Sequence, residues 1–252
     1  MERFSTLRGL PPASMWTRAL SATATLLAVG TAQASWDATQ DFATGSNPAG
    51  VWSYGYYAST NGSQEFRAFS QATSALAGFE GFTGWFDPIY SVLYAPNAAR
   101  NLSQATVHNV LPGQLTLHPG PGPSEWAVLR FTAPSDGSYS VATQFLAGDL
   151  GETEAHIILN GGKLPTVLAH LGVTSVNPSY ASVGISMSAG DTLDFAVGNN
   201  GDFHFDNTPL TVAISAVPEP SSAILLAAGI AAFCWRRRVA APVGSVPLSQ
   251  AC

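Results

Sequence analysis

The chain has 252 residues, of which 46% are hydrophobic and only 10% are charged, and its 10 basic and 16 acidic residues give a formal net charge of −6. Between Ser35 and Val217 four basic residues are outnumbered by fourteen acidic ones, a net charge of −10. Such a stretch repels nucleic acid and anionic lipid, which excludes a nucleic-acid-binding module. It also contains no cysteine, which excludes thiol catalysis and cysteine-ligated zinc there.

The first 34 residues have the layout of a secretory signal peptide. Three arginines in the first 18 residues precede "ALSATATLLAVGTAQA", a run of small and apolar residues. The run ends in Ala32, Gln33 and Ala34, an A-x-A cleavage signature. We expect residues 1–34 to form a signal helix that the Sec translocase recognises, and the mature chain to begin at Ser35. An uncleaved amphipathic helix is the alternative.

The segment from Ser35 to about Val110 is rich in aromatic residues, glycine and alanine, and is typical of strands with long loops. Trp52, Tyr54 and Tyr56 are spaced two apart, which places them on one face of a strand. An exposed row of rings would stack on the C–H faces of sugars, and Trp85 would extend it. These four residues are therefore candidate glycan-binding residues. The alternative is that the row is the buried face of a core strand.

Short alternating runs bounded by Gly, Pro, Asn and Asp follow from residue 126 onward. They predict strands over 126–133, 138–148, 154–159, 182–188, 192–198 and 209–215, with a hairpin turn at Asn160-Gly161. In the fourth run, Val183, Ile185 and Met187 are expected on one face. Roughly nine strands at this spacing predict an all-β fold, an antiparallel β-sandwich of jelly-roll type, in one domain over residues 35–216.

The stretch "VPEPSSAILLAAGIAAFCWRRR" ends this domain. Its apolar run Ser221–Trp235 would rise about 22 Å as a helix, whereas a bilayer core is about 30 Å thick. The arginines that follow favour the cytoplasmic side. We expect a transmembrane helix over 221–235 that inserts in the inner membrane at least transiently. The alternatives are a plain single-pass anchor and, for Pro218-Glu219-Pro220, a rigid linker, because prolines hold the backbone extended.

This three-part layout resembles the PEP-CTERM sorting signal of Gram-negative bacteria. The motif is matched by Val217, Pro218, Glu219, Pro220 and Ser221, and the basic cluster by Arg236, Arg237 and Arg238. The resemblance implies an exported protein that an exosortase cuts near the motif, and an association with exopolysaccharide production. Members of that family usually stop soon after the arginines, whereas residues 239–252 form a further tail here.

The body is similar to one that recurs among secreted proteins with this signal. The pieces that carry the resemblance are "DFATGSNPAGVWSYGY", "LHPG", "LRFTAPSDGSYSV", "LNG" and "AGDTLDFAVGNNGD". The resemblance implies a jelly roll like that of carbohydrate-binding modules. It carries over no catalytic residues, and we predict none.

Two polar stretches contain candidate calcium ligands, because calcium prefers loops with carboxylate and amide oxygens. The candidates are Asp149, Glu152 and Glu154 in "GDLGETE" and Asp202 and Asp206 in "NNGDFHFDN". Neither stretch has the EF-hand pattern, and ordinary polar turns are the alternative. The five histidines form neither H-x-H nor H-E-x-x-H, so a zinc or iron site would need histidines distant in the sequence.

We therefore expect an exported, non-catalytic protein of the envelope or extracellular matrix that needs no cofactor apart from the candidate calcium. Its expected partners are the Sec translocase, the exosortase, the inner membrane through the C-terminal helix and, at the outer surface, extracellular polysaccharide. One alternative is a self-associating matrix protein without a ligand. The other is a glycan-active enzyme, for which Glu80 and Glu125 are the carboxylates beside aromatic residues.

Overall fold

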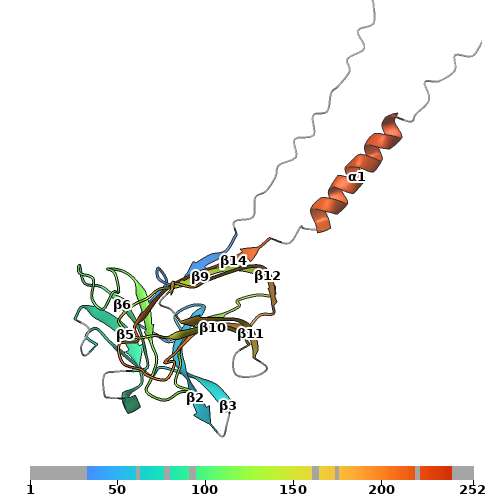
Figure 1. The fold of residues 1–252 in the computed structure, drawn as a ribbon. Helices are drawn as coiled ribbons and strands as arrows, with labels where there is room; N and C mark the ends of the chain where they lie inside the picture. The colour runs from blue at the N-terminus through green and yellow to red at the C-terminus, as the bar shows by residue number, and fades with distance from the viewer. Residues whose placement is uncertain are drawn as a thin grey trace, which may run out of the picture. The chain divides into compact units, whose positions relative to one another are not determined.

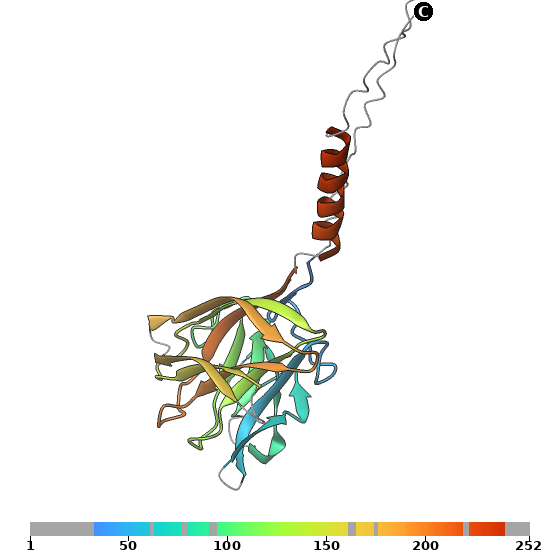
Figure 2. The same cartoon turned by 90° about the vertical axis from the view of Figure 1, so that its right-hand side faces the viewer.

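The computed structural model describes residues 33–60, 63–76, 80–90, 95–160, 165–173, 176–218 and 222–239. Two antiparallel sheets form a sandwich, and a single helix follows it in the described part of the chain (Figure 1, Figure 2). This confirms the prediction of an all-β sandwich. The predicted signal peptide lies outside the described residues except for Gln33 and Ala34.

The larger sheet has eight strands in the order β12-β9-β14-β7-β6-β5-β4, with β1 paired to β14 beside β7. In chain order the strands are β1 (Ser35–Asp37), β4 (Gln71–Thr73), β5 (Phe82–Phe86), β6 (Asn97–Asn101), β7 (Leu115–His118), β9 (Gly137–Phe145), β12 (Ser179–Met187) and β14 (Thr208–Val217). A 3₁₀ turn, η1 (Pro88–Tyr90), follows β5.

The second sheet has six strands in the order β11-β10-β13-β8-β2-β3. In chain order they are β2 (Trp52–Thr60), β3 (Ser63–Ala68), β8 (Ala127–Thr132), β10 (Glu154–Leu159), β11 (Thr166–Val173) and β13 (Thr192–Gly198). In Figure 1 the strands β10 and β11 lie across from β9, β12 and β14 of the larger sheet. The inner faces of the two sheets enclose the main core.

Aromatic rings dominate this core, where each fully buried large side chain contributes roughly 1.5–3 kcal/mol. Trp52 meets Phe131 edge-on, with ring centroids 5.4 Å apart. Phe131 in turn meets Tyr139 of the opposite sheet at 5.8 Å. Tilted and edge-on contacts of this kind are the favoured geometry of aromatic pairs. They join β2 and β8 of one sheet to β9 of the other.

Strand β14 holds the larger sheet together. Along one side Leu210–Val217 pairs with β9, and along the other side β14 pairs first with β7 and then with β1. Its alternating sequence explains the position: Leu210, Val212 and Ile214 are buried, whereas Thr211 and Ala213 between them are exposed. The last strand of the sandwich therefore ends at Val217, the first residue of the V-P-E-P-S motif. We call the segment from Val217 to Arg238 the sorting stretch.

One predicted strand face is wrong at Val183. This side chain is 79% exposed, while Met187 is buried and Ile185 is partly buried. The register between β12 and β9 shifts between Ser182 and Ile185, and Gly184 within the shift has a φ of +84°. A bulge of this kind reverses the side-chain alternation. The strand number was also underestimated, because β1–β6 of the aromatic N-terminal segment add strands to both sheets.

The single described helix, α1 (Ser222–Val239), covers the predicted transmembrane segment and continues through the three arginines. Its side chains from Ala228 to Arg236 are exposed. Within the ranges that the structure describes, no helix has both the length and the apolar character needed to span a bilayer.

Candidate functional sites

The predicted aromatic platform is not at the surface. Trp52 and Tyr54 are 0% exposed, Tyr56 1% and Trp85 6%. Tyr54 stacks on Trp85 with centroids 6.3 Å apart, and Trp52 donates from Nε1 to Asp41 Oδ2 at 3.0 Å. The row is buried because β2 lies inside its sheet, between β8 and β3, with this face on the core. The glycan-stacking prediction is therefore wrong for these four residues.

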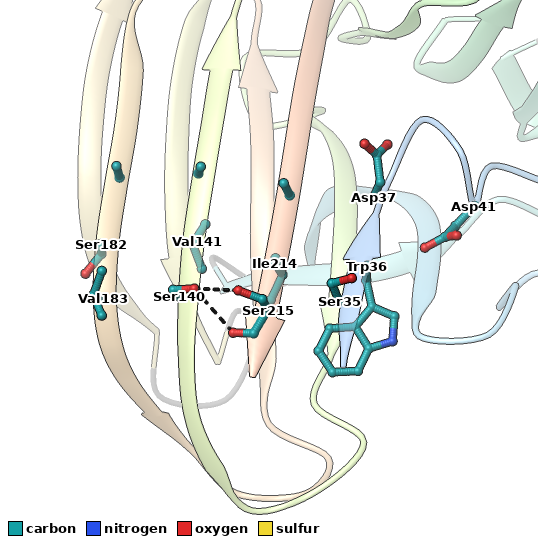
Figure 3. Close-up of a pocket in the computed structure, with 13 residues that line it drawn as sticks. Ser35, Trp36, Asp37, Asp41, Ser140, Val141, Ser182, Val183, Ile214 and Ser215 are labelled. Atoms are coloured by element: carbon teal, nitrogen blue, oxygen red, sulfur yellow. Dashed lines mark hydrogen bonds between the residues drawn. The ribbon is translucent and has the colours of Figure 1, made fainter. Parts of the chain in front are cut away.

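A groove instead crosses the outer face of the larger sheet, over β1, β14, β9 and β12 (Figure 3). Its volume is about 760 Å³. A second hollow of about 300 Å³ continues it, since the two share Asp37, Ala142, Ala181 and Ala213. Together the two hollows form the outer groove, a shallow trough over four neighbouring strands.

The floor of the outer groove consists of small side chains. Ala142 lies directly opposite Ala213, and Ser140 lies opposite Ser215. The hydroxyls of Ser140 and Ser215 hydrogen-bond to each other at 2.7 Å (Figure 3). The exposed side chain of Val183 also lines the groove. Sequence reasoning missed this surface because alternating serine and alanine carry no chemical signature.

Four of the five candidate calcium ligands lie where the β9–β10 loop and the β13–β14 loop come together. Asp206 is only 1% exposed, and neither of its carboxylate oxygens has a hydrogen-bond partner among the described residues. Burial, reinforced by the charges of Asp202 and Asp149, raises the pKa of Asp206 to about 8. A Cβ on Gly151 would lie 2.0 Å from Asp206 Oδ1, so only glycine fits against this carboxylate.

The neighbours of Asp206 have partners of their own. Asp149 Oδ2 lies 2.9 Å from His108 Nδ1 and accepts from Asn207 Nδ2 at 3.5 Å. Asp202 is exposed and lies 2.6 Å from His204 Nδ1. In the described ranges these carboxylates do not form a compact cluster of three ligands. Calcium binding here stays a prediction, and Asp206 is the residue on which it rests.

Glu152 stays with that group, whereas Glu154 lies apart from it on β10. Glu152 lies on a small hollow of about 330 Å³ with Asp202 and His204. Glu154 instead points to two histidines: its Oε2 lies 3.4 Å from His156 Nε2 and 3.6 Å from His170 Nε2. Burial lowers the pKa of His156 even though Glu154 acts in the opposite direction.

We call Glu154, His156 and His170 the β10–β11 cluster. Glu154 and His156 are two residues apart on β10 and share a face of that strand, and His170 lies directly opposite His156 on β11. The third member could be found only from the register of the hairpin. That register is shifted twice, between Glu154 and His156 and between Ile157 and Ile158, so counting from the turn does not give it.

Glu125, one of the two carboxylates of the enzyme alternative, has a structural contact. Its Oε2 accepts the backbone N–H of Gly122 at 2.7 Å, within the loop between β7 and β8. Glu80, the other carboxylate, is exposed just before β5.

The sorting stretch follows β14 without a spacer. Val217 still pairs with Ser138 of β9, Pro218 is exposed, and α1 begins at Ser222. Residues 216–238 match the PEP-CTERM protein-sorting motif. The chain therefore carries the sorting signal that its sequence resembles. Glu219, Pro220 and Ser221 lie outside the described residues, while Arg236, Arg237 and Arg238 belong to the last turns of α1.

Comparisons of the fold give distant likenesses. A family 35 carbohydrate-binding module from Clostridium thermocellum has 13% identity and a TM-score of 0.29, over 73% of this chain and 98% of the module. A cellulose-binding domain of a Cellulomonas fimi β-1,4-glucanase has 11% identity and a TM-score of 0.27, over 42% and 80%. Pika GITRL has 18% identity and a TM-score of 0.26, over 40% and 95%.

These distant likenesses assign neither a ligand nor a function to this chain. The sequence itself has no match among curated proteins.

Proposed function

We propose that the chain is an exported, non-catalytic β-sandwich that an exosortase separates from its C-terminal helix at the outer side of the inner membrane. The observation that carries the proposal is the match of residues 216–238 to the PEP-CTERM protein-sorting motif, directly after the last strand. In this proposal the N-terminal signal opens the Sec route, and the helix delays release until the sandwich is outside.

The order of the last strand, the proline-containing motif, the helix and the arginines supports this proposal. Arginines resist translocation, so Arg236–Arg238 at the end of α1 favour the cytoplasmic side and leave the sandwich outside. Prolines do not continue a regular strand or helix, and two of them lie between Val217 and Ser222. A protease needs an extended, accessible peptide, and this is the place in the chain where cleavage leaves β14 complete.

Intact mass of the protein from native cells tests this proposal. The wild-type chain should begin at Ser35 and end near Ser221. Glu219→Gln should accumulate as a membrane-associated form that retains Cys252, whereas Glu65→Gln, the same change at an exposed position of β3, should be processed normally. A wild-type protein that retains Cys252 in the mature fraction would contradict the proposal.

We further propose that the outer groove binds extracellular polysaccharide. Its volume of about 760 Å³ lies in the range of small-molecule sites, and the second hollow lengthens it along the sheet. Serine hydroxyls and the carboxylates of Asp37 and Asp41 line it and match the hydroxyl groups of a sugar chain. The competing occupant is a second copy of this chain packed on the same smooth face.

Filling the groove tests both occupants. Ala213 is exposed on its floor, so Ala213→Tyr should block the groove without disturbing the core. Ala68→Tyr, at an exposed position of the edge strand β3, is the matched control. Ala213→Tyr should abolish binding to exopolysaccharide from the producing cells in a pull-down, and Ala68→Tyr should not. Concentration-dependent assembly of the wild type in analytical ultracentrifugation, lost in Ala213→Tyr without any glycan, would favour self-association.

A further inference from the structure

We propose that the β10–β11 cluster of Glu154, His156 and His170 binds one divalent transition-metal ion, of which Zn²⁺ is the natural probe. The proposal is independent of the sorting function. In the described part of the chain, these are the residues whose carboxylate and imidazole ligand atoms all lie within 4.8 Å of one another. They come from two neighbouring strands, so a bound ion would join the edge strand β11 to the sheet.

The distances fit a tetrahedral ion. Zinc bonds to imidazole nitrogen and carboxylate oxygen are about 2.0–2.1 Å long, which places two ligand atoms of a tetrahedron about 3.3 Å apart. Glu154 Oε2 lies 3.4 Å from His156 Nε2 and 3.6 Å from His170 Nε2. Both carboxylate–imidazole distances are therefore close to those around a bound ion, the two imidazole nitrogens lie within 4.8 Å of each other, and a fourth position stays open for water.

His156 is the fixed member of the cluster. It is 7% exposed, and its ring stacks on Trp126 with centroids 4.1 Å apart and planes 12° apart. Its Nε2 is buried, and its contact with Glu154 Oε2 at 3.4 Å is longer than an ordinary hydrogen bond. Buried polar atoms nearly always have a partner, and a metal ion would supply one to this nitrogen.

Gly198 leaves room for the Glu154 carboxylate because it has no side chain. A Cβ there would lie 2.7 Å from Glu154 Oε1 and 2.7 Å from Trp126 Nε1. Gly198 pairs with Glu154 across β13 and β10, so the glycine opens the space that the carboxylate occupies. This arrangement positions the carboxylate beside the histidine pair.

His170 is the adjustable member. Its ring stacks on His156 at 4.3 Å with planes 14° apart, whereas a ligating lone pair lies in the plane of its own ring. His170 must therefore turn out of the stack to share an ion with His156. Its side chain is 57% exposed and β11 is an edge strand, so the turn is sterically open.

The ligand set selects the class of ion. Imidazole suits zinc, copper and nickel, whereas calcium and magnesium prefer oxygen ligands throughout. Two imidazoles and one carboxylate therefore favour a transition metal. The expected consequence is a metal-dependent clamp between β10 and β11.

Calorimetric titration of the full-length protein, purified without a histidine tag, with ZnCl₂ tests the proposal. The wild type should bind one Zn²⁺ per chain. His170→Ala and Glu154→Gln should each weaken binding by about tenfold or more, since changes to second-shell partners alone cost about 10–100-fold. His204→Ala is the matched control, because His204 is 58% exposed and also pairs with a carboxylate but has no third ligand; its binding should equal that of the wild type.

Thermal unfolding gives a second readout that does not depend on the calorimetric signal. Zinc should raise the midpoint of the wild type and of His204→Ala, and leave that of His170→Ala unchanged. Circular dichroism of each variant without zinc establishes that it is folded, which is expected because His170 is exposed. Wild-type protein without saturable binding at one ion per chain, or His170→Ala that binds as tightly as the wild type, would overturn the proposal.

Discussion

Asp206 and Asp194 are both fully buried aspartates, but only Asp194 has a cation beside it. Arg130 contacts both oxygens of Asp194 at 2.7 Å, while the oxygens of Asp206 have no partner in the described structure. Burial raises the pKa of both carboxyls. Arg130 offsets part of the cost of burying the Asp194 carboxylate, whereas no cation among the described residues offsets that cost for Asp206.

Replacement of Asp206 by asparagine should therefore remove a pH dependence of stability. The folded pKa of about 8 lies above the unfolded value near 3.8, so between these values the folded state keeps a proton that the unfolded state has released. The free energy of unfolding then falls as pH rises from about 4 to about 8. Asp206→Asn should equal the wild type near pH 4 and exceed it by several kcal/mol above pH 8, because asparagine does not ionise and each tenfold change in proton affinity corresponds to about 1.4 kcal/mol.

Urea unfolding of both proteins at pH 4.5 and pH 8.5 measures this difference. Glu65→Gln is the control, because Glu65 is exposed on the edge strand β3 and does not belong to the loops that hold Asp206. Calcium should raise the stability of the wild type at pH 8.5 and leave Asp206→Asn unchanged. Equal pH dependence in wild type and Asp206→Asn would show that Asp206 is not the residue that titrates.

At the scale of single residues, alternation in the sequence predicts which side chains share a face but not where that face points. Trp52, Tyr54 and Tyr56 do share one face, and it is the core face. The pattern alone is equally compatible with an exposed row. The decision depends on the strands that flank β2, and β8 is about 70 residues away in sequence. The pairing of His156 with His170 is likewise a property of register.

At the scale of elements, three neighbouring strands of the smaller sheet are tied by one polar network on the face away from the main core. Tyr57 on β2 donates to Asp194 Oδ2 at 2.5 Å, and Arg130 on β8 donates to both oxygens of Asp194 on β13. The guanidinium also lies 3.8 Å from the ring centroid of Phe66 on β3. Four strands of the sheet thus meet at one ion pair.

Removal of Asp194 should destabilise the sandwich strongly. Asp194→Ala leaves the Arg130 guanidinium without its carboxylate, and breaking a buried pair in this way costs about 3–5 kcal/mol. Tyr57→Phe keeps the ion pair and loses only one hydrogen bond to a charged group, worth about 1.5–3 kcal/mol. Urea unfolding at pH 7 should rank the proteins as wild type, Tyr57→Phe and Asp194→Ala in decreasing stability. The reverse order of the two variants would mean that the network is not organised around Asp194.

The elements of the second half of the domain were predictable because their alternation is regular and turn residues bound each run. The predicted runs correspond to β8, β9, β10, β12, β13 and β14. The prediction of which side chains face the core failed in β12, because Gly184 has a φ of +84° and the bulge there turns Val183 to the outer face. The short strands β4 to β6 are separated by loops and carry few alternating residues, so the sequence pattern does not predict them.

At the scale of the molecule, the expected start of the mature chain lies beside the end of the last strand. Ser35, the expected first residue of the mature chain, pairs with Ser215, and the N–H of Ala216 donates to the carbonyl of Ala34 at 2.9 Å. The antiparallel pairing of β1 with β14 places the first residues of the sandwich beside the C-terminal end of β14, where the sorting stretch leaves the sheet. Signal cleavage and release by the exosortase would thus occur at one end of the larger sheet.

This arrangement predicts where the chain tolerates truncation. A protein of residues 35–218 keeps β14 whole and should unfold cooperatively, with a midpoint within a few degrees of that of the full chain. A protein of residues 35–209 loses the pairing of β14 with β9 and with β1, and buries neither Val212 nor Ile214, so it should not fold. Thermal melts followed by circular dichroism distinguish the two. A folded 35–209 fragment would show that β14 is dispensable and would contradict its role in holding the larger sheet together. An unfolded 35–218 fragment would show that α1 stabilises the sandwich, and this result would contradict release of an intact domain by a cut after Val217.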